Sequence, residues 1–263
     1  MLLLLALLGC EGAEAPTVAA VAQAEPAVVE PAAVEPAVVE PAPIAPTEEK
    51  MPTLRPPPPG FVALMDVIPN LRLEIRYHTA NNFTGAPVPG YAAPGAWLLV
   101  EAADALARVQ ASLAPDGLGL YVYDAYRPAR GTKAFVAWAA RTGQIHLVDG
   151  GYIARRSGHN QGDTIDLSLC ALSTGLPVDM GTDWDLLDAR SHTKNATGDA
   201  LKNRLRLRDA MSAQGFHPYS KEWWHFSMDL PGLKHRDVPY GAEEPEEGAW
   251  SPPPGWDQPG WTP

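Results

Sequence analysis

Residues 157–169 read SGHNQGDTIDLSL, the stretch that most constrains the fold. Apolar side chains alternate with polar ones in its second half, which predicts a strand over Thr164–Leu169. Gly162 just before that strand permits a turn. A turn there would bring His159 and Asp166, an imidazole and a carboxylate that both suit Zn²⁺, to one point. By itself the pair is a weak signal, because a solvated loop histidine beside a strand aspartate is commoner.

Segments on both sides of this stretch predict further helices and strands. Helical spacing of apolar residues predicts helices over Trp97–Leu113, Pro128–Thr142 and Asp199–Gln214, and short apolar runs predict strands over Leu118–Tyr123 and Trp223–Met228. No glycine-rich phosphate loop joins a strand to a helix, which argues against a dinucleotide-binding fold. We therefore expect an α+β domain with a small, mostly antiparallel sheet packed with helices.

Some individual side chains can also be placed. On the last predicted helix, four basic residues are expected to face solvent: Lys202, Arg204, Arg206 and Arg208. Cys170 follows a predicted strand and is expected to be a small buried hydrophobic residue.

Charge and proline divide the 263 residues into a folded middle and two flanks. Residues 61–242 hold 18 acidic and 18 basic side chains, so the net charge of −11 belongs to the flanks. Residues 11–60 carry eight acids and two bases, and the Pro- and Trp-rich residues 243–263 carry five acids and no base. Within the first flank, residues 25–46 repeat the unit EPAVV, in which regular proline forbids a helix. We expect one domain between disordered flanks, with no basic surface for nucleic acid.

The N-terminus predicts export. Residues 1–9, MLLLLALLG, form an apolar run too short to span a bilayer, which needs about 20 residues. The following Leu7-Leu8-Gly9-Cys10 resembles the lipobox of bacterial lipoproteins, which implies a periplasmic or cell-envelope protein whose only membrane attachment is a lipid anchor at Cys10. The alternatives are a plain signal peptide with an incidental cysteine, or a start codon placed late, since no Lys or Arg precedes the run.

Two further segments concentrate polar residues beside predicted strands. Glu222-Trp-Trp-His225 offers a second imidazole three residues after a carboxylate. Because a regular strand sends residues i and i+3 to opposite faces, Glu222 must lie at the strand entrance or in a bulge to share a site with His225. Asp124-Ala-Tyr-Arg127-Pro128 follows another strand, and Pro128 biases Arg127 toward extended backbone. The commoner role of such an arginine is a surface salt bridge.

In order and spacing these segments resemble the zinc-dependent D-alanyl-D-alanine dipeptidases of the VanX type and their relatives, the zinc D,D-carboxypeptidases. The family signature S-x-H-x-x-G-x-x-x-D is matched from Ser157 to Asp166, E-W-W-H at 222–225 and Y-R-P at 126–128. Smaller matches extend the resemblance over residues 64–230: Arg76-Tyr77, Asn82-Phe-Thr-Gly85, Met180-Gly-Thr-Asp-Trp-Asp185, Arg190-Ser-His192, Asn203-Arg204 and Gly215-Phe216. The resemblance implies that residues 61–242 form a zinc dipeptidase domain.

The resemblance also implies roles for individual residues. One Zn²⁺ per chain would be bound at the sheet by His159, Asp166 and His225, which leaves the open fourth position of a catalytic zinc site. Glu222 would be the general base, and Arg127 would stabilise the developing oxyanion. The implied reaction is hydrolysis of D-alanyl-D-alanine, or a similar dipeptide, to free amino acids in the cell envelope.

A free dipeptide has two charged ends that need partners. The resemblance offers Asp185, with Tyr77 beside it, for the ammonium group and Ser157 for the terminal carboxylate. For Asp185 the alternative is a helix cap or turn residue. Asp124 is expected to orient a neighbouring side chain.

Other functions remain open at this point. Asn160 directly after His159 is closer to the D,D-carboxypeptidases, so trimming of peptidoglycan stem peptides is the alternative reaction. Two non-enzymatic alternatives are a zinc module that binds wall peptides and a lipoprotein scaffold. The first would typically lack Glu222 or Arg127, and the second would not need so complete a catalytic set. Export favours wall recycling or nutrient salvage over antibiotic resistance.

Overall fold

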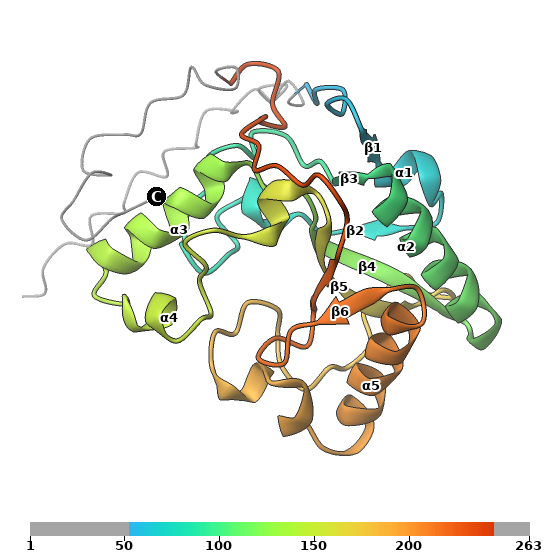
Figure 1. Cartoon of the computed structure of the whole chain (residues 1–263). Helices are drawn as coiled ribbons and strands as arrows, with labels where there is room; N and C mark the ends of the chain where they lie inside the picture. The colour runs from blue at the N-terminus through green and yellow to red at the C-terminus, as the bar shows by residue number, and fades with distance from the viewer. Residues whose placement is uncertain (1–52, 245–263) are drawn as a thin grey trace, which may run out of the picture. The chain divides into compact units, whose positions relative to one another are not determined.

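The computed structural model describes residues 53–244 (Figure 1). The predictions for the signal segment with Cys10, for the repeat and for the Trp-rich end of the chain lie outside the described residues. Residues 53–55 run alongside the end of the described chain, where Leu54 forms a single β-bridge with Gly241. Among residues 53–244, no helix is both long enough and apolar enough to cross a bilayer.

A five-stranded sheet forms the centre of the domain. Its spatial order is β2-β4-β5-β7-β6, with only the pair β2–β4 parallel. The strands cover Arg72–Leu73 (β2), Leu118–Asp124 (β4), Thr164–Ala171 (β5), Phe216–Pro218 (β6) and His225–Met228 (β7). A separate antiparallel pair joins β1 (Phe61–Ala63) to β3 (Trp97–Leu99). The expected α+β fold with a small, mostly antiparallel sheet is confirmed.

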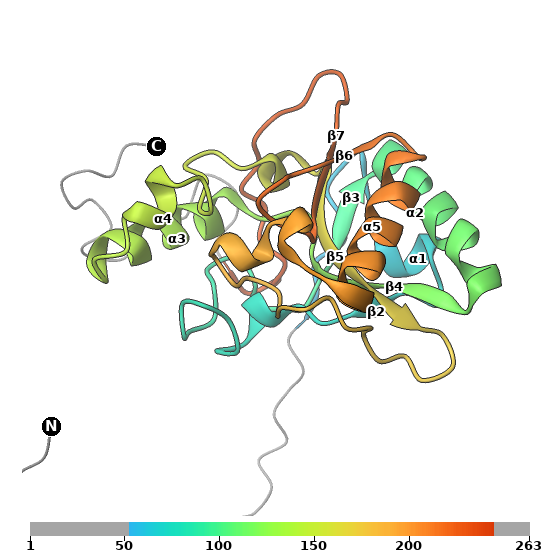
Figure 2. The ribbon, with the colours of Figure 1, turned by 90° about the horizontal axis from the view of Figure 1, so that it is seen from below.

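The helices pack in two groups (Figures 1 and 2). They cover Leu64–Val67 (α1), Val100–Leu113 (α2), Ala129–Arg141 (α3), His146–Asp149 (α4) and Gly198–Ser212 (α5). Helices α2 and α5 contact each other, and α2 also packs on β4. Helix α3 contacts α4, and in both views this pair lies on the opposite side of the domain from α2 and α5. Short 3₁₀ turns cover Arg76–His78, Ala114–Asp116, Gly158–Gln161, Ala189–Ser191 and Thr193–Asn195.

Two elements begin two or three residues later than the sequence predicts, and the other predicted elements differ by at most two residues at either end. The helix expected from Trp97 begins only at Val100, because Trp97–Leu99 pairs with β1. Apolar side chains on a short buried strand fit helical spacing equally well, so periodicity alone could not separate the two. The strand expected from Trp223 begins only at His225, since the two tryptophans before it lie in a buried turn.

The prediction that Arg204 faces solvent is wrong. Arg204 is 1% exposed, and its guanidinium donates to the backbone oxygens of Met180 at 2.7 Å, Arg190 at 3.0 Å and His192 at 2.9 Å. Because an arginine carries five N–H donors, it can satisfy several loop carbonyls that have no strand partner. Lys202 and Arg206 are exposed as expected, and Arg208 is partly exposed. Cys170 is buried, as the sequence predicted.

Candidate active site and metal centre

Three predicted ligands converge where β5 and β7 meet. Asp166 pairs with His225 across these strands, and His159 reaches them from the 3₁₀ turn before β5. The Asp166 Oδ1 atom lies 2.9 Å from His225 Nδ1 and 3.2 Å from His159 Nε2. The two ring nitrogens are 3.3 Å apart. Of the described residues, this is the one group of three or more His, Cys, Asp and Glu side chains arranged to hold a metal ion.

The donor atoms have the spacing of a zinc site. In tetrahedral coordination with bonds of about 2.0–2.2 Å, two ligand atoms lie about 3.3–3.6 Å apart. The three distances, 2.9 to 3.3 Å, lie at or a few tenths of an ångström below the lower end of this range. Two imidazoles and one carboxylate are also a donor set that zinc accepts while keeping a fourth position open. The residues present therefore fit a zinc ion.

The backbone fixes which nitrogen of His159 is free to bind a metal. His159 Nδ1 lies 2.6 Å from the backbone oxygen of Ala125. A carbonyl oxygen can only accept, so Nδ1 carries the hydrogen and Nε2 keeps its lone pair on the side of Asp166. His159 itself is 1% exposed.

Asp166 is ionised. Burial alone would raise the pKa of its carboxyl group, but the charges and hydrogen bonds of His159 and His225 outweigh burial and hold that pKa below the usual range. A permanently charged carboxylate favours binding of a divalent cation.

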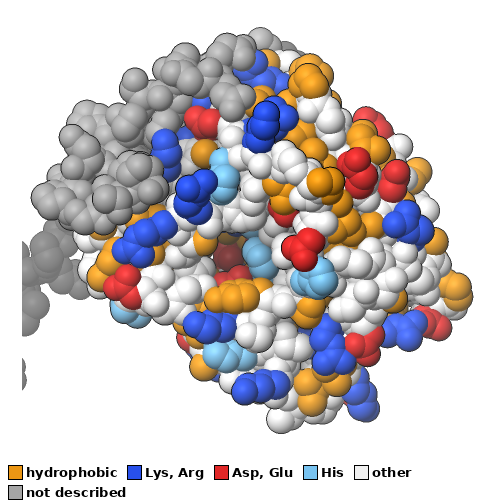
Figure 3. All heavy atoms as spheres, viewed as in Figure 1, with side chains coloured by type: hydrophobic (Ala, Val, Ile, Leu, Met, Phe, Trp, Pro, Cys, Tyr) orange, Lys and Arg blue, Asp and Glu red, His pale blue; other side chains and the backbone are white. Residues whose placement is uncertain are grey.

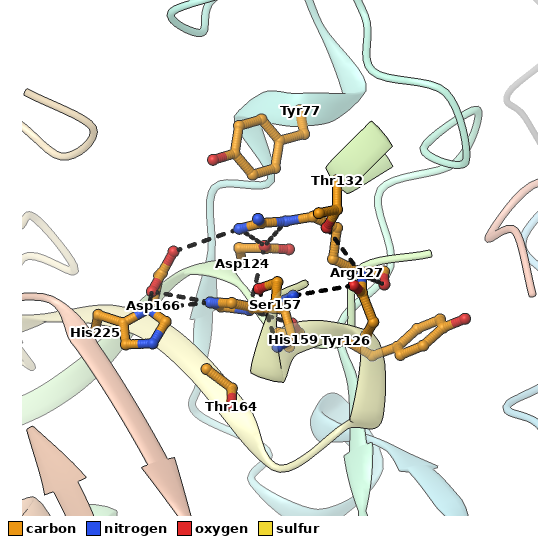
Figure 4. A network of polar contacts seen from close by, with 12 residues as sticks. Tyr77, Asp124, Tyr126, Arg127, Thr132, Ser157, His159, Thr164, Asp166 and His225 are labelled. Atoms are coloured by element: carbon orange, nitrogen blue, oxygen red, sulfur yellow. Dashed lines mark hydrogen bonds and ion pairs between the residues drawn. The ribbon is translucent and has the colours of Figure 1, made fainter. Parts of the chain in front are cut away.

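Arg127 lies beside this cluster, bound to Asp124 (Figure 4). Its Nε donates to Asp124 Oδ2 at 3.0 Å, and its Nη2 lies 2.8 Å from the same oxygen and 3.9 Å from Asp166 Oδ2. The guanidinium carbon lies 4.8 Å from the centre of the Phe135 ring. Arg127 is 8% exposed and Asp124 is completely buried, so the alternative of a surface salt bridge is wrong.

Asp124 is also held from the other side, by a residue that the sequence did not flag. The Tyr91 hydroxyl donates to Asp124 Oδ1 at 2.5 Å. Tyr91 lies 33 residues earlier in a loop, where no motif or periodicity points to it. Asp124 thus fixes the guanidinium of Arg127, which agrees with the expectation that it orients a neighbour.

Glu222 lies at the entrance of β7, as a shared site with His225 requires. Its Oε2 is 3.8 Å from His225 Nδ1, and the residue is 7% exposed. Burial, followed by the charges of Asp166 and Asp185, raises the pKa of Glu222 well above its usual value. A carboxyl group with a raised pKa is suited to taking up and returning a proton near neutral pH.

Tyr77 and Asp185 line the same cavity as the three predicted metal ligands and contact each other. The Tyr77 hydroxyl donates to Asp185 Oδ2 at 2.7 Å. Asp185 has φ +59°, a left-handed conformation that aspartate and asparagine adopt more readily than other residues apart from glycine. Burial, followed by the charge of Asp166, raises the pKa of the Asp185 carboxyl group to about 8.

Ser157 caps the 3₁₀ turn that carries His159. Its hydroxyl oxygen accepts from the backbone N–H of His159 at 3.3 Å. The hydroxyl is the acceptor in that bond, so its own hydrogen can still be donated to a ligand.

All these side chains face one cavity of about 490 Å³, except Asp124 and Tyr91, which lie behind it. Figure 3 shows a hollow near the centre of this face, with acidic and histidine side chains inside it. The cavity brings together every predicted site residue: Tyr77, Arg127, Ser157, His159, Asp166, Asp185, Glu222 and His225. It is also lined by Phe83 of the Asn82–Gly85 match and by residues that the motifs did not single out, among them Phe135, Tyr152, Arg156 and Tyr219.

Comparison with known proteins identifies the family. The family model for D-ala-D-ala dipeptidases, peptidase M15, matches residues 58–238. The chain belongs to this family. It is a metallopeptidase of the dipeptidase type.

Curated relatives match over most of their own length. A D-alanyl-D-alanine dipeptidase of Enterococcus faecium is 35% identical over 196 residues, which cover 69% of this chain and 94% of that protein. The protein of the same name from Streptomyces coelicolor is 36% identical over 183 residues, covering 64% of this chain and 91% of the relative. That of Escherichia coli K12 is 34% identical, covering 64% and 84%.

Proposed function

We propose that this chain hydrolyses D-alanyl-D-alanine, or a similar dipeptide, with one zinc ion held by His159, Asp166 and His225. The observation that carries the proposal is the meeting of these three donor atoms within 2.9 to 3.3 Å, in one cavity with Glu222 and Arg127. The names of the similar proteins supply the substrate. A zinc ion bound there would polarise the peptide carbonyl and lower the pKa of a water molecule.

Two residues would transfer the proton of the attacking water and stabilise the negative charge on the carbonyl oxygen. Glu222 would take the proton of the attacking water and return it to the leaving amine, as its raised pKa allows. Arg127 would stabilise the negative charge that develops on the carbonyl oxygen. Its bonds to Asp124 hold the guanidinium before the substrate arrives, so little reorganisation is needed during the reaction.

The remaining polar residues would bind the two ends of the dipeptide. Asp185 would pair with the ammonium group and Ser157 would donate to the terminal carboxylate. The Tyr77–Asp185 hydrogen bond supports a site limited at its amino side, because a longer peptide would extend toward this pair. That limit favours a dipeptidase over the alternative of a D,D-carboxypeptidase acting on stem peptides.

The test is release of D-alanine, measured by mass spectrometry, from D-alanyl-D-alanine and separately from a wall pentapeptide. We expect release from the dipeptide only, loss with a chelator, and recovery with added zinc. Glu222→Gln should reduce kcat by at least about 100-fold, whereas Glu101→Gln on the exposed side of α2 should have no effect. Release from the pentapeptide would favour the carboxypeptidase. No release from either, with zinc bound, would leave only the zinc-binding module.

We also propose that the protein is an exported lipoprotein anchored at Cys10, where it would meet dipeptides released during wall turnover. The support is the apolar run of residues 1–9 and the lipobox-like residues 7–10. Labelling of cells with a radioactive fatty acid should mark the wild-type chain and not Cys10→Ser. A labelled variant, or an unlabelled wild type, would contradict the anchor.

A further inference from the structure

The segment that follows β7 returns across the loop carrying Arg127. Residues 236–244 run from the end of the sheet past the start of α3 (red in Figure 1). Arg236 accepts from the backbone N–H of Ala129 at 3.0 Å and donates its own N–H to the backbone oxygen of Asn160 at 2.9 Å. One residue of this segment thus joins the Arg127 loop to the turn of His159.

Tyr240 makes the most deeply buried of these contacts. It is 0% exposed, and its hydroxyl donates to the backbone oxygen of Tyr126 at 2.7 Å while accepting the backbone N–H of Trp97 at 3.2 Å. Its ring lies 4.2 Å from the Trp97 ring, centre to centre. A Cβ atom at Gly95 would come within 2.1 Å of the same ring, so Gly95 is needed for this packing.

The Tyr126 peptide is the last one before Arg127, so its orientation sets where the arginine side chain begins. Val238 donates its backbone N–H to the Tyr126 hydroxyl at 2.8 Å. Arg127 in turn donates its N–H to the His159 backbone oxygen at 3.0 Å and accepts from Asn160 Nδ2 at 2.8 Å. The loop is therefore fixed from one side by the His159 turn and from the other by Val238 and Tyr240.

The far end of the segment is anchored beside Tyr91. The Glu244 carboxylate accepts the backbone N–H groups of Gly90 at 2.9 Å and Ala92 at 2.8 Å. Tyr240 donates its own N–H to the Gly90 oxygen at 2.9 Å. These contacts hold the turn whose Tyr91 binds Asp124, the partner of Arg127.

We propose that Tyr240 is a positioning residue for Arg127, acting through the Tyr126 carbonyl. Tyr240 lies beyond residue 238, the last residue of the family match. The inference rests on the proposed function, because Arg127 must contribute to hydrolysis for its placement to affect the rate. Removal of the Tyr240 hydroxyl leaves the buried Tyr126 oxygen and Trp97 N–H without this partner, which frees the loop to shift.

The test is Tyr240→Phe, which keeps the buried ring, in the full zinc-loaded protein with D-alanyl-D-alanine as substrate. A small misplacement of a charged group in an active site lowers the rate by about 10- to 100-fold, and we expect kcat to fall by that factor. KM should change by less than about threefold, because substrate binding relies on other residues. The zinc content should stay at one per chain.

A double-mutant cycle separates positioning from general destabilisation. If Tyr240 acts through Arg127, Tyr240→Phe should add almost nothing to the loss caused by Arg127→Lys. Two controls should keep wild-type kcat: Tyr121→Phe, which removes a tyrosine hydroxyl on β4, and Leu106→Ala, which truncates a buried side chain of α2 and should lower Tm. If Tyr240→Phe does not fold, Tyr126→Phe replaces it: this variant removes the hydroxyl that accepts the backbone N–H of Val238, the second contact by which residues 236–244 hold Tyr126, and the same fall in kcat is expected.

Three results would overturn the inference. Unchanged kcat in Tyr240→Phe would show that the hydroxyl does not matter for the rate. Additive losses in the cycle would show that it does not act through Arg127. An inactive wild type would instead reject the proposed function, and the inference would fall with it.

Discussion

Tyr77 and Asp185 are 108 residues apart in the sequence, yet their side chains are joined by a hydrogen bond of 2.7 Å. Trp184, next to Asp185, packs on the Tyr77 ring with centres 4.9 Å apart. The wall of the cavity opposite the metal ligands is therefore built from two distant segments that hold each other. The position of Asp185 depends on this bond as much as on its own loop.

Removal of the Tyr77 hydroxyl should weaken substrate binding. A hydrogen bond between neutral groups is worth about 0.5–1.5 kcal/mol, so we expect Tyr77→Phe to raise KM for the dipeptide by about 2- to 10-fold, with a smaller change in kcat. Steady-state kinetics would measure both. Tyr123→Phe is the matched control, because its ring also packs on Trp184. An unchanged KM in Tyr77→Phe would contradict a role for this wall in binding.

The raised pKa of Asp185 should make stability depend on pH. The carboxyl group has a pKa of about 8 in the folded protein, against about 3.9 in an unfolded chain. Between these values the folded state holds a proton that the unfolded state has lost, so its contribution to stability falls as pH rises from about 4 to about 8. The Asp185→Asn side chain cannot titrate. The Tm of this variant should therefore increase relative to that of wild type as the pH rises from about 4 to about 8.

This comparison should use protein stripped of metal, because a bound cation would pull the pKa of Asp185 down. Tm would be measured between pH 4 and pH 9. The two curves should meet near pH 4 and separate by several degrees near pH 8. Parallel curves would mean that Asp185 titrates at its ordinary pKa.

The sequence predicted local features of this molecule and missed the long-range ones. Alternation over Thr164–Leu169 predicted β5, and the turn at Gly162 brings His159 close to Asp166, because both depend on short stretches of chain. The register that places Asp166 opposite His225 joins residues 59 apart, and only the family resemblance suggested it. Side-chain periodicity carries no information on which strands pair.

The sequence also failed to predict which charged side chains are buried. An arginine on an amphipathic helix normally faces water, and nothing in the local pattern marks Arg204 as different. Its partners are backbone oxygens in loops 12 to 24 residues away. The sequence of a loop does not show which of its backbone oxygens lack a hydrogen-bond donor. Tyr91 and Tyr240 escaped notice for the same reason.

Replacement of Arg204 by methionine should destabilise the domain strongly. The variant keeps an unbranched apolar chain but leaves the backbone oxygens of Met180, Arg190 and His192 without their donor. At about 1 kcal/mol for each lost bond, we expect the free energy of unfolding to fall by about 3 kcal/mol. Lys202→Met on the same helix removes only an exposed ion pair with Asp199 and should cost less than about 1 kcal/mol. Urea denaturation would measure both, and equal losses would contradict a structural role for Arg204.

Gly162→Ala should damage both stability and metal binding. Gly162 has φ +84°, and an added Cβ would lie 2.1 Å from the ring of Phe61. We expect a loss of about 2–4 kcal/mol, from the left-handed backbone and from the clash together. Gly198→Ala is the matched control: its φ is +58° and nothing lies within 4 Å, so only the backbone cost of about 1 kcal/mol should remain.

The two glycine variants should differ further in zinc affinity. Gly162 sits between His159 and Asp166, so any shift of its backbone changes the 3.2 Å separation of His159 Nε2 and Asp166 Oδ1. Gly198 begins α5, away from the three donor atoms. Competition with a chromogenic chelator should show weaker zinc binding for Gly162→Ala and wild-type binding for Gly198→Ala. Equal zinc affinity in the two variants would mean that the turn at Gly162 does not set the spacing of the ligands.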